Sequence, residues 1–120
     1  MISINYRDGR PIYEQVRDGF RQLIITGVLP AGSRMPSVRE MASSLTINPN
    51  TIQRAYRELE AEGYTVSVPG KGSFVTDRLD AVLARREALL TDFRSLVGEL
   101  KQMGAEKADL TRVIQEEYNT

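Results

Sequence analysis

A well-delimited amphipathic helix predicted between residues 48 and 63 places the strongest constraint on what this chain can fold into. Asn48 is a favourable N-cap, and Pro49 falls at the first helical position, where its missing N–H does no harm. Gly63 stands where a left-handed C-terminal residue is wanted. The sequence therefore predicts a helix of about four turns. Its apolar side chains recur at the i, i+3, i+4, i+7 spacing of one face and are Ile52, Ala55, Tyr56 and Leu59.

The opposite face of this helix is polar and contains no acid along most of its length. Its side chains are Asn50, Gln53, Arg54 and Arg57. The acidic residues Glu58, Glu60 and Glu62 come only afterwards, whereas a face that merely meets water usually mixes Glu with Lys. Asn, Gln, Thr and Arg are the side chains that reach base edges and phosphates in a DNA groove. The pattern therefore favours a DNA-facing surface over a solvated one.

Two more helices are predicted ahead of this one. Residues 11–26 form a helix that Pro11 opens and Gly27 closes, with an apolar stripe made of Ile12, Val16, Phe20, Leu23 and Ile24. Ser37 and Glu40 fit a capping box, which starts a short helix that turns Val38, Met41, Ala42 and Leu45 inward. A turn of a few residues links this short helix to the polar-faced one. The pair therefore has the layout of a helix-turn-helix.

After Gly63 the pattern changes to the period of two that is typical of strands. Residues 64–68 and 73–75 are short strand candidates on either side of the sequence PGKG. A hairpin directly after a helix-turn-helix is a wing, in which Gly70 and Gly72 let the backbone approach a groove and Lys71 places a cation at the apex. This motif alone leaves open that PGKG is only a tight turn.

The sequence from residue 76 onward predicts one long helix ended by Gly104 and a last short helix over residues 107–118. An apolar stripe this long is more than the winged domain needs for its own core. We expect it to face a partner, because such an exposed stripe would otherwise be a liability; packing against the first helix is the alternative. The predicted fold is mostly α with a small β wing: a winged helix-turn-helix domain over residues 1–76 and a two-helix dimerisation region over residues 77–120.

Composition narrows the class of function. The chain has 120 residues, with 16 basic and 16 acidic side chains, so it carries no net charge. Residues 1–78 hold ten basic and eight acidic side chains, so the N-terminal part is the better candidate for binding a polyanion. Because the chain has no Cys and no His, we expect no disulfide, no metal site and no cofactor, and an enzyme is disfavoured. No apolar run approaches a membrane span or a signal peptide, so we expect a cytoplasmic protein with no membrane partner.

The motifs PSVREMA, NPNTIQRAY, LEAEGY and GKGSFV occur in this order within residues 10–76. In order and spacing they resemble the winged helix-turn-helix domain of the GntR family of bacterial transcription regulators. The short C-terminal part resembles the YtrA subfamily, whose members carry only two helices after the wing and use them to dimerise. The resemblance implies a homodimeric regulator, most often a repressor in this family, that binds a palindromic operator in double-stranded DNA. A small-molecule effector is left open.

The resemblance also assigns residues to these roles. The DNA contacts that it implies are Arg39, Asn48, Asn50, Thr51, Gln53, Arg54, Gly70 and Lys71. The dimer contacts expected from the apolar pattern are Leu83, Leu90, Phe93, Val97, Leu100, Leu110, Val113 and Ile114. One position departs from the family, since many relatives have a basic residue just before the wing glycine and this chain has Pro69. We therefore expect Lys71 to supply more of the wing's affinity.

Two other readings compete with this one. The first is a winged-helix module that binds proteins and never touches DNA, which the acid-free polar face argues against. The second is a fragment of a longer regulator fused to an aminotransferase-like domain, which the helical ending after Gly104 disfavours.

Overall fold

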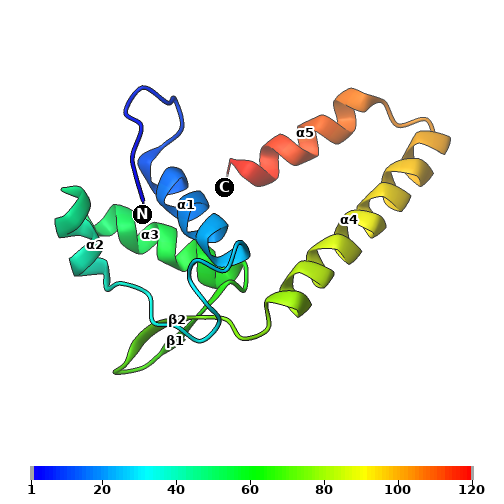
Figure 1. Cartoon of the computed structure of the whole chain (residues 1–120). Coiled ribbons are helices and arrows are strands. Elements are labelled where there is room, and N and C mark those ends of the chain that lie inside the picture. The colour runs from blue at the N-terminus through cyan, green and yellow to red at the C-terminus, as the bar shows by residue number, and fades with distance from the viewer. Residues whose placement is uncertain (1, 120) are drawn as a thin grey trace. The chain divides into compact units, whose positions relative to one another are not determined.

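The computed structural model describes residues 2–119 and confirms a mostly helical fold with a small antiparallel hairpin (Figure 1). The elements in chain order are α1 (Ile12–Ile25), α2 (Val38–Leu45), α3 (Pro49–Ala61), β1 (Thr65–Val68), β2 (Gly72–Val75), α4 (Leu79–Gln102) and α5 (Lys107–Tyr118). The chain divides into two compact units, one running to Val82 and the other starting at Leu83.

The core of the first unit lies where α1 packs on α3. All four apolar residues predicted for the inner face of α3 are buried, and so are Val16, Phe20 and Ile24 of α1. The Phe20 and Tyr56 rings form a T-shaped pair with a centroid distance of 5.5 Å and an interplanar angle of 86°. An edge-to-face pair of this kind adds to the energy of burying the two rings. The apolar stripes read from the sequence therefore meet each other and fix α3 on α1.

Side-chain caps define where α2 and α3 begin. The Ser37 hydroxyl oxygen accepts a hydrogen bond from the Glu40 N–H at 3.0 Å, which is the serine half of the predicted capping box. The Asn48 side-chain oxygen accepts from the Asn50 N–H at 2.8 Å, with Pro49 at the first helical position. Each cap satisfies an N–H that has no partner within its own helix. The predicted helix starts are therefore confirmed.

Ion pairs join α1 to the C-terminal half of α3. Arg17 Nη1 lies 2.6 Å from Glu58 Oε1. Arg21 binds Glu62 through two hydrogen bonds, from Nη2 at 2.7 Å and from Nε at 3.0 Å. The hydrogen bond to Glu62 raises the pKa of Arg21 above its ordinary value. Two of the acids that follow the polar face of α3 are thus engaged by α1.

The turn of the helix-turn-helix contains a strained residue. Thr46 has φ 55° and ψ 51°, in the left-handed region, and is the only non-glycine residue with positive φ among residues 2–119. The conformation lets the Ile47 N–H donate to the Ala42 carbonyl at 2.9 Å and so closes α2. A β-branched residue is a genuine outlier here, because its Cβ crowds the backbone.

Thr46→Gly is therefore expected to stabilise the first unit. Relief of roughly 1–2 kcal/mol of left-handed strain is partly offset by roughly 0.4–1 kcal/mol for the greater freedom of glycine in the unfolded chain. The net gain of about 0.5–1 kcal/mol should raise the melting temperature by a few degrees in a circular-dichroism melt. Thr46→Ala removes the branched side chain but keeps a Cβ and should give less of this gain. A lower melting temperature for the glycine variant would contradict the strain at this turn.

The wing is a two-stranded hairpin extended by the loop before α2. Thr65 pairs with Val75 and Val68 with Gly72. The loop adds a short bridged segment on the other edge of β2, where the Met35 N–H donates to the Ser73 carbonyl and the Val75 N–H to the Ser33 carbonyl, both at 2.8 Å. These backbone hydrogen bonds therefore attach the loop before α2 to the wing.

The turn at the wing tip explains why a proline is found at position 69. The Lys71 N–H donates to the Val68 carbonyl at 2.9 Å, and Gly70 between them has φ 76°. Proline followed by a glycine with positive φ at the two central positions is typical of a type II turn. The departure from a basic residue at position 69 therefore gives a defined turn that presents Lys71 at the exposed tip.

The second unit consists of most of α4 and α5, joined by a tight turn. Gly104 has φ 90°, and the Ala105 N–H donates to the Leu100 carbonyl at 3.0 Å, which ends α4 as a Schellman motif does. The Glu106 N–H donates to Asp109 Oδ2 at 2.9 Å and opens α5. Neither α4 nor α5 contains a buried residue. Among residues 2–119, no helix is long and apolar enough to cross a membrane.

Candidate nucleic-acid interface

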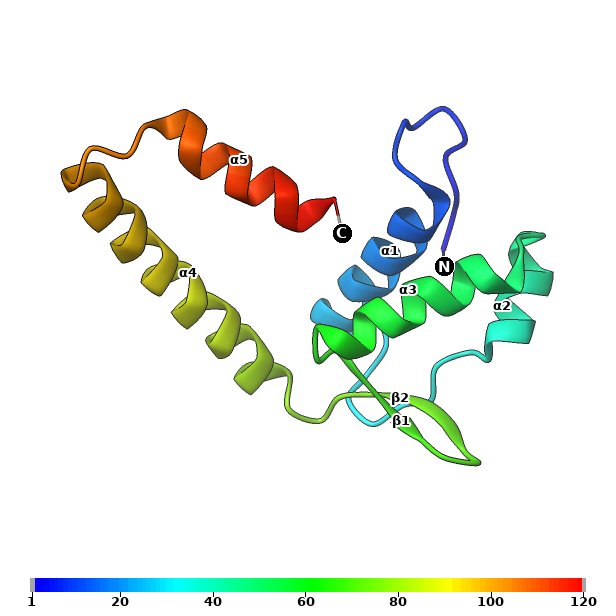
Figure 2. The same ribbon diagram turned by 180° about the vertical axis from the view of Figure 1, so that it is seen from behind.

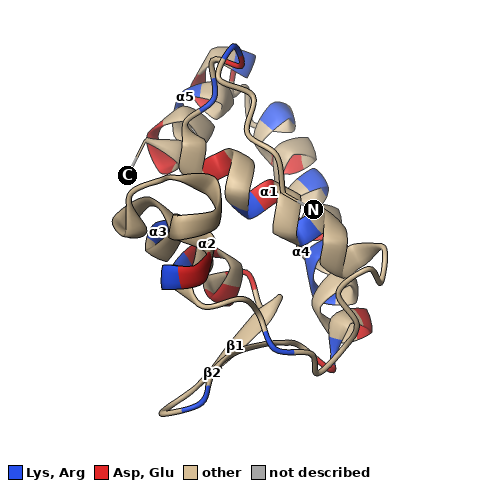
Figure 3. Cartoon of the chain, turned by 60° about the vertical axis from the view of Figure 1, so that its left-hand side comes forward, with Lys and Arg blue, Asp and Glu red and all other residues tan. Residues whose placement is uncertain are grey.

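The polar side of α3 and the hairpin belong to one unit and are both open to solvent. Asn50 and Gln53 are exposed and Thr51 is half-buried, while the apolar face of the same helix is buried in the core. The hairpin extends beyond the helices of this unit in both views (Figures 1 and 2). It carries basic and no acidic colouring near its tip (Figure 3). A convex helix face beside a protruding hairpin has the shape needed to enter two grooves of a duplex.

Four cations on α2, α3, the wing and the loop before α2 have no acidic partner in the described part of the chain. Arg39 sits in the first turn of α2 with its side chain exposed, and Lys71 sits at the wing tip. Within residues 2–119, none of the ion pairs involves Arg34, Arg39, Arg57 or Lys71. The remaining arginines of α1 and α3 are paired with carboxylates. Arg7 and Arg78 of the same unit also take part in no ion pair among the described residues, but they lie outside these elements, so the loop before α2, the start of α2, α3 and the wing carry four of the unit's unpaired cations.

Arg54 differs from its neighbours on the polar face. Its guanidinium carbon lies 3.7 Å from the centre of the Tyr13 ring on α1, and its Nε lies 3.4 Å from Glu58 Oε2. Such a cation–π contact holds the side chain against α1. Helical spacing alone grouped Arg54 with Gln53 and Asn50, but the packing of α1 on α3 draws it toward the flank of the helix.

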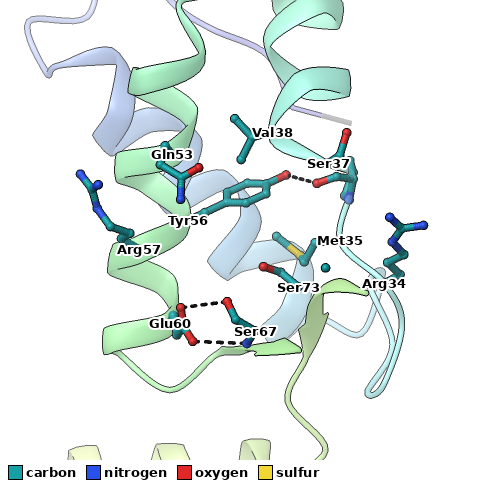
Figure 4. Close-up of a pocket in the computed structure, with 12 residues that line it drawn as sticks. Arg34, Met35, Ser37, Val38, Gln53, Tyr56, Arg57, Glu60, Ser67 and Ser73 are labelled. Atoms are coloured by element: carbon teal, nitrogen blue, oxygen red, sulfur yellow. Dashed lines mark hydrogen bonds between the residues drawn. The ribbon is translucent and has the colours of Figure 1, made fainter. Parts of the chain in front are cut away.

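A groove of about 210 Å³ separates α3 from the wing (Figure 4). Gln53 is the predicted DNA-contacting residue that lines it. Tyr56 lies across its floor, where its hydroxyl donates to the Pro36 carbonyl at 2.7 Å, and burial raises the pKa of this phenol. Tyr56 thus anchors the helix, as expected from its place on the apolar stripe. The loop before α2 is fastened to α3 by the same bond.

Two residues of this surface were missed among the predicted contacts. Arg57 was recognised on the polar face of α3 but was not included among them. Arg34 lies in a turn-rich loop, and no local pattern distinguishes it from an ordinary solvated arginine. Its isolated β-bridge to Phe74 brings it to the edge of the wing. That placement depends on a tertiary contact.

The described residues contain no group of three or more Asp or Glu side chains arranged to hold a metal ion. The chemistry that the surface does offer is recognition by hydrogen bonding and charge. Exposed amide and guanidinium groups can bind base edges bidentately. Unpaired cations can bind phosphates.

Comparisons with known proteins agree with this geometry. The family model described as "Bacterial regulatory proteins, gntR family" matches residues 12–75. The HTH-type transcriptional repressor YtrA of Bacillus subtilis is 32% identical over 118 residues, which cover 97% of this chain and 91% of the relative. YtrA from Sulfolobus acidocaldarius, a GntR-family transcription factor, superposes with a TM-score of 0.63 at 33% identity and covers 80% of this chain and 97% of its own.

A further solved structure contains DNA. The DNA-binding domain of AraR in complex with operator ORE1 has a TM-score of 0.55 and 25% identity to this chain, and covers 63% of this chain and 93% of its own. The matched family consists of DNA-binding transcription regulators. The chain belongs to the GntR family of bacterial regulatory proteins, among its YtrA-like members.

Proposed function

We propose that this protein is a cytoplasmic transcription repressor that binds a palindromic operator as a homodimer. The observation that carries the proposal is the exposed, acid-free start of α3, flanked by the unpaired cations Arg39 and Lys71. Two similar proteins support it: the Bacillus subtilis relative is named a transcriptional repressor, and the AraR domain was solved on an operator.

Each predicted contact has a physical role in this proposal. Arg39 and Gln53 read base edges in the major groove, where Arg suits guanine and Gln suits adenine. Asn50 and Thr51 lie in the first turn of α3 and reach a base or a phosphate beside the helix N-terminus. The Asn48 oxygen is already used as the cap, so its amide NH2 group remains free to donate to DNA.

The flanking contacts position the protein on the duplex. Gly70 and Lys71 bring the wing tip to the minor groove, where Lys71 neutralises a phosphate or lies along the groove floor. Arg54 binds a phosphate from the flank of α3, since the Tyr13 ring holds its guanidinium away from the centre of the helix face. These contacts strengthen binding to any sequence and carry no sequence information directly.

The homodimer rests on the apolar side chains of α4 and α5. Leu90, Phe93, Leu100, Val113 and Ile114 are exposed in the single chain, and Leu83, Val97 and Leu110 are half-buried. Two copies that cover these side chains hold two winged units together and convert the second half-site contact into an intramolecular event. A two-fold dimer requires a palindromic site, with half-sites about one helical turn apart or a multiple of it.

A gel shift on the DNA upstream of the protein's own gene tests this function directly. A duplex selected from a random library by the purified protein would define the site and its symmetry. Failure to bind any duplex at low salt would overturn the function. No effector site is proposed; a small molecule that co-purifies with the protein would be the first sign of one.

Arg39→Ala and Gln53→Ala are each expected to weaken binding to the selected site by roughly 1–3 kcal/mol and to relax sequence preference at one position. The reason is that a bidentate contact to a base edge is lost. Lys71→Ala is the matched contrast, because it should weaken binding to all sequences alike. Competition gel shifts with single-base variants of the site measure the difference. Unchanged affinity and unchanged preference in all three variants would show that the DNA face is elsewhere.

A further inference from the structure

The groove between α3 and the wing is lined by the two elements proposed to enter different grooves of DNA. Gln53 and Arg57 come from α3, while Ser67 and Ser73 come from the two strands of the wing. Arg34 and Ser37, from the segment leading into α2, close the remaining side. Figure 4 shows Arg34 and Arg57 on opposite sides of this groove.

The charge in the groove is positive. Arg34 and Arg57 are exposed and take part in no ion pair within residues 2–119. Glu60 is the acidic residue of the lining, and its two oxygens accept hydrogen bonds from the Ser67 N–H at 3.3 Å and the Ser67 hydroxyl at 3.1 Å. Its carboxylate is thereby turned to the wall, where it links α3 to β1.

Arg34 is held against the wing. The Met35 N–H donates to the Ser73 carbonyl at 2.8 Å, and Arg34 itself forms a β-bridge with Phe74. A Cβ at Gly72 would lie 3.3 Å from Arg34 Nε, so the guanidinium rests on bare wing backbone. Gly72 has φ 113°, which also favours glycine. Arg34 is therefore attached to the wing. It gives the wing a second cation in addition to Lys71, a charge that Pro69 does not provide.

The geometry of a DNA duplex determines which part of the DNA must lie in this groove. Adjacent major and minor grooves are separated by one sugar–phosphate strand, so a protein that inserts α3 into one and the wing into the other must straddle that strand. We propose that the groove between α3 and the wing is the seat of this backbone, with Arg34 binding phosphate from the wing side and Arg57 from the helix side. Ser37 and Ser73 supply hydroxyl donors between them. This inference rests on the proposed function and adds two positioning residues to it.

Salt dependence of DNA binding tests these two contacts. Each phosphate neutralised by a cation contributes about 0.9 to the slope of log K against log salt on B-DNA. We therefore expect Arg34→Gln and Arg57→Gln each to lower the slope by about 0.9, and the double variant by about 1.8. At 0.1 M salt, one such contact corresponds to about an eightfold change in affinity if counterion release is its whole contribution. Fluorescence anisotropy with the full-length protein, on the selected site and on an unrelated duplex, measures both quantities.

Lys107→Gln is the matched control, since it removes one positive charge from the first turn of α5 in the other unit and should leave the slope unchanged. Melting temperatures should stay close to wild type in both arginine variants, because neither side chain is buried or ion-paired.

The outcomes separate this inference from the function on which it rests. Equal losses on both duplexes with reduced slopes support the phosphate seat. Slopes that match wild type would overturn it, as would altered base preference, which would make these arginines readers of sequence. A wild-type protein that binds neither duplex would overturn the proposed function itself.

Discussion

Phe93→Asp and Leu100→Asp are each expected to produce monomers whose winged unit still folds but that no longer bind an operator tightly. The Phe93 and Leu100 side chains are 38% and 40% exposed in the single chain, so neither is needed for the core around Phe20. Burying a large apolar side chain contributes roughly 1.5–3 kcal/mol, so a handful of them can hold a dimer against the entropy of association. A carboxylate placed among them would be buried without a partner, which costs more than the lost contact.

Analytical ultracentrifugation and a gel shift on the same samples test this expectation. Ser95→Asp is the matched control, because it adds the same charge to an exposed position of α4 that lies outside the apolar set. The control should remain dimeric and bind as wild type does. A wild-type protein that is monomeric at micromolar concentration, yet binds its operator tightly, would remove the dimer model altogether.

Residues that cap or end helices made most of the fold predictable from the sequence. The start of α3 follows from Asn48 and Pro49, and the end of α4 from Gly104, because caps and left-handed glycines act within one turn of the helix. The start and end of α5 match the range 107–118 predicted from its apolar pattern. Signals of this kind depend on neighbours in the sequence and need no knowledge of the tertiary structure.

The candidate site was less predictable, because two of its features arise from contacts between distant segments. Arg34 becomes part of the wing only through its bridge to Phe74. Arg54 leaves the centre of the polar face because Tyr13, on a different helix, offers its ring. Helical spacing assigns a side chain to a face but does not say which neighbouring element will engage it. The residue lists taken from spacing and resemblance therefore leave out Arg34 and Arg57, which the structure places beside the groove that faces the wing.

Thr46 shows a different limit of prediction. Its left-handed conformation is required by the turn between α2 and α3, yet threonine has no preference for that region. The sequence predicted a tight turn without indicating which residue would take the strain. A turn held at some cost between the two helices proposed to face DNA fits a surface whose geometry matters more than its local stability.

Phe20→Ala is expected to cost the first unit roughly 3–5 kcal/mol of unfolding free energy. Phe20 is 0% exposed and forms a T-shaped ring pair with Tyr56, whose hydroxyl in turn fastens the loop before α2. Truncation leaves a cavity between α1 and α3 that the surrounding helices fill only in part. Since small domains are stable by only about 5–15 kcal/mol, the loss should lower the melting temperature by more than about 10 °C.

The effect on DNA binding should follow from the same packing. α3 presents its polar face only while its apolar face is seated on α1, so loosening that contact weakens operator binding even where wild type is fully folded. Phe20→Leu is the control, because it retains most of the side-chain volume and should cost far less than the alanine variant. Circular-dichroism melts give the stability, and gel shifts at two temperatures below the wild-type melt give the affinity. Below its own melting temperature Phe20→Ala should still sediment as a dimer, in contrast to Phe93→Asp. Equal melting temperatures for the alanine and leucine variants would show that Phe20 does not hold α3 in place.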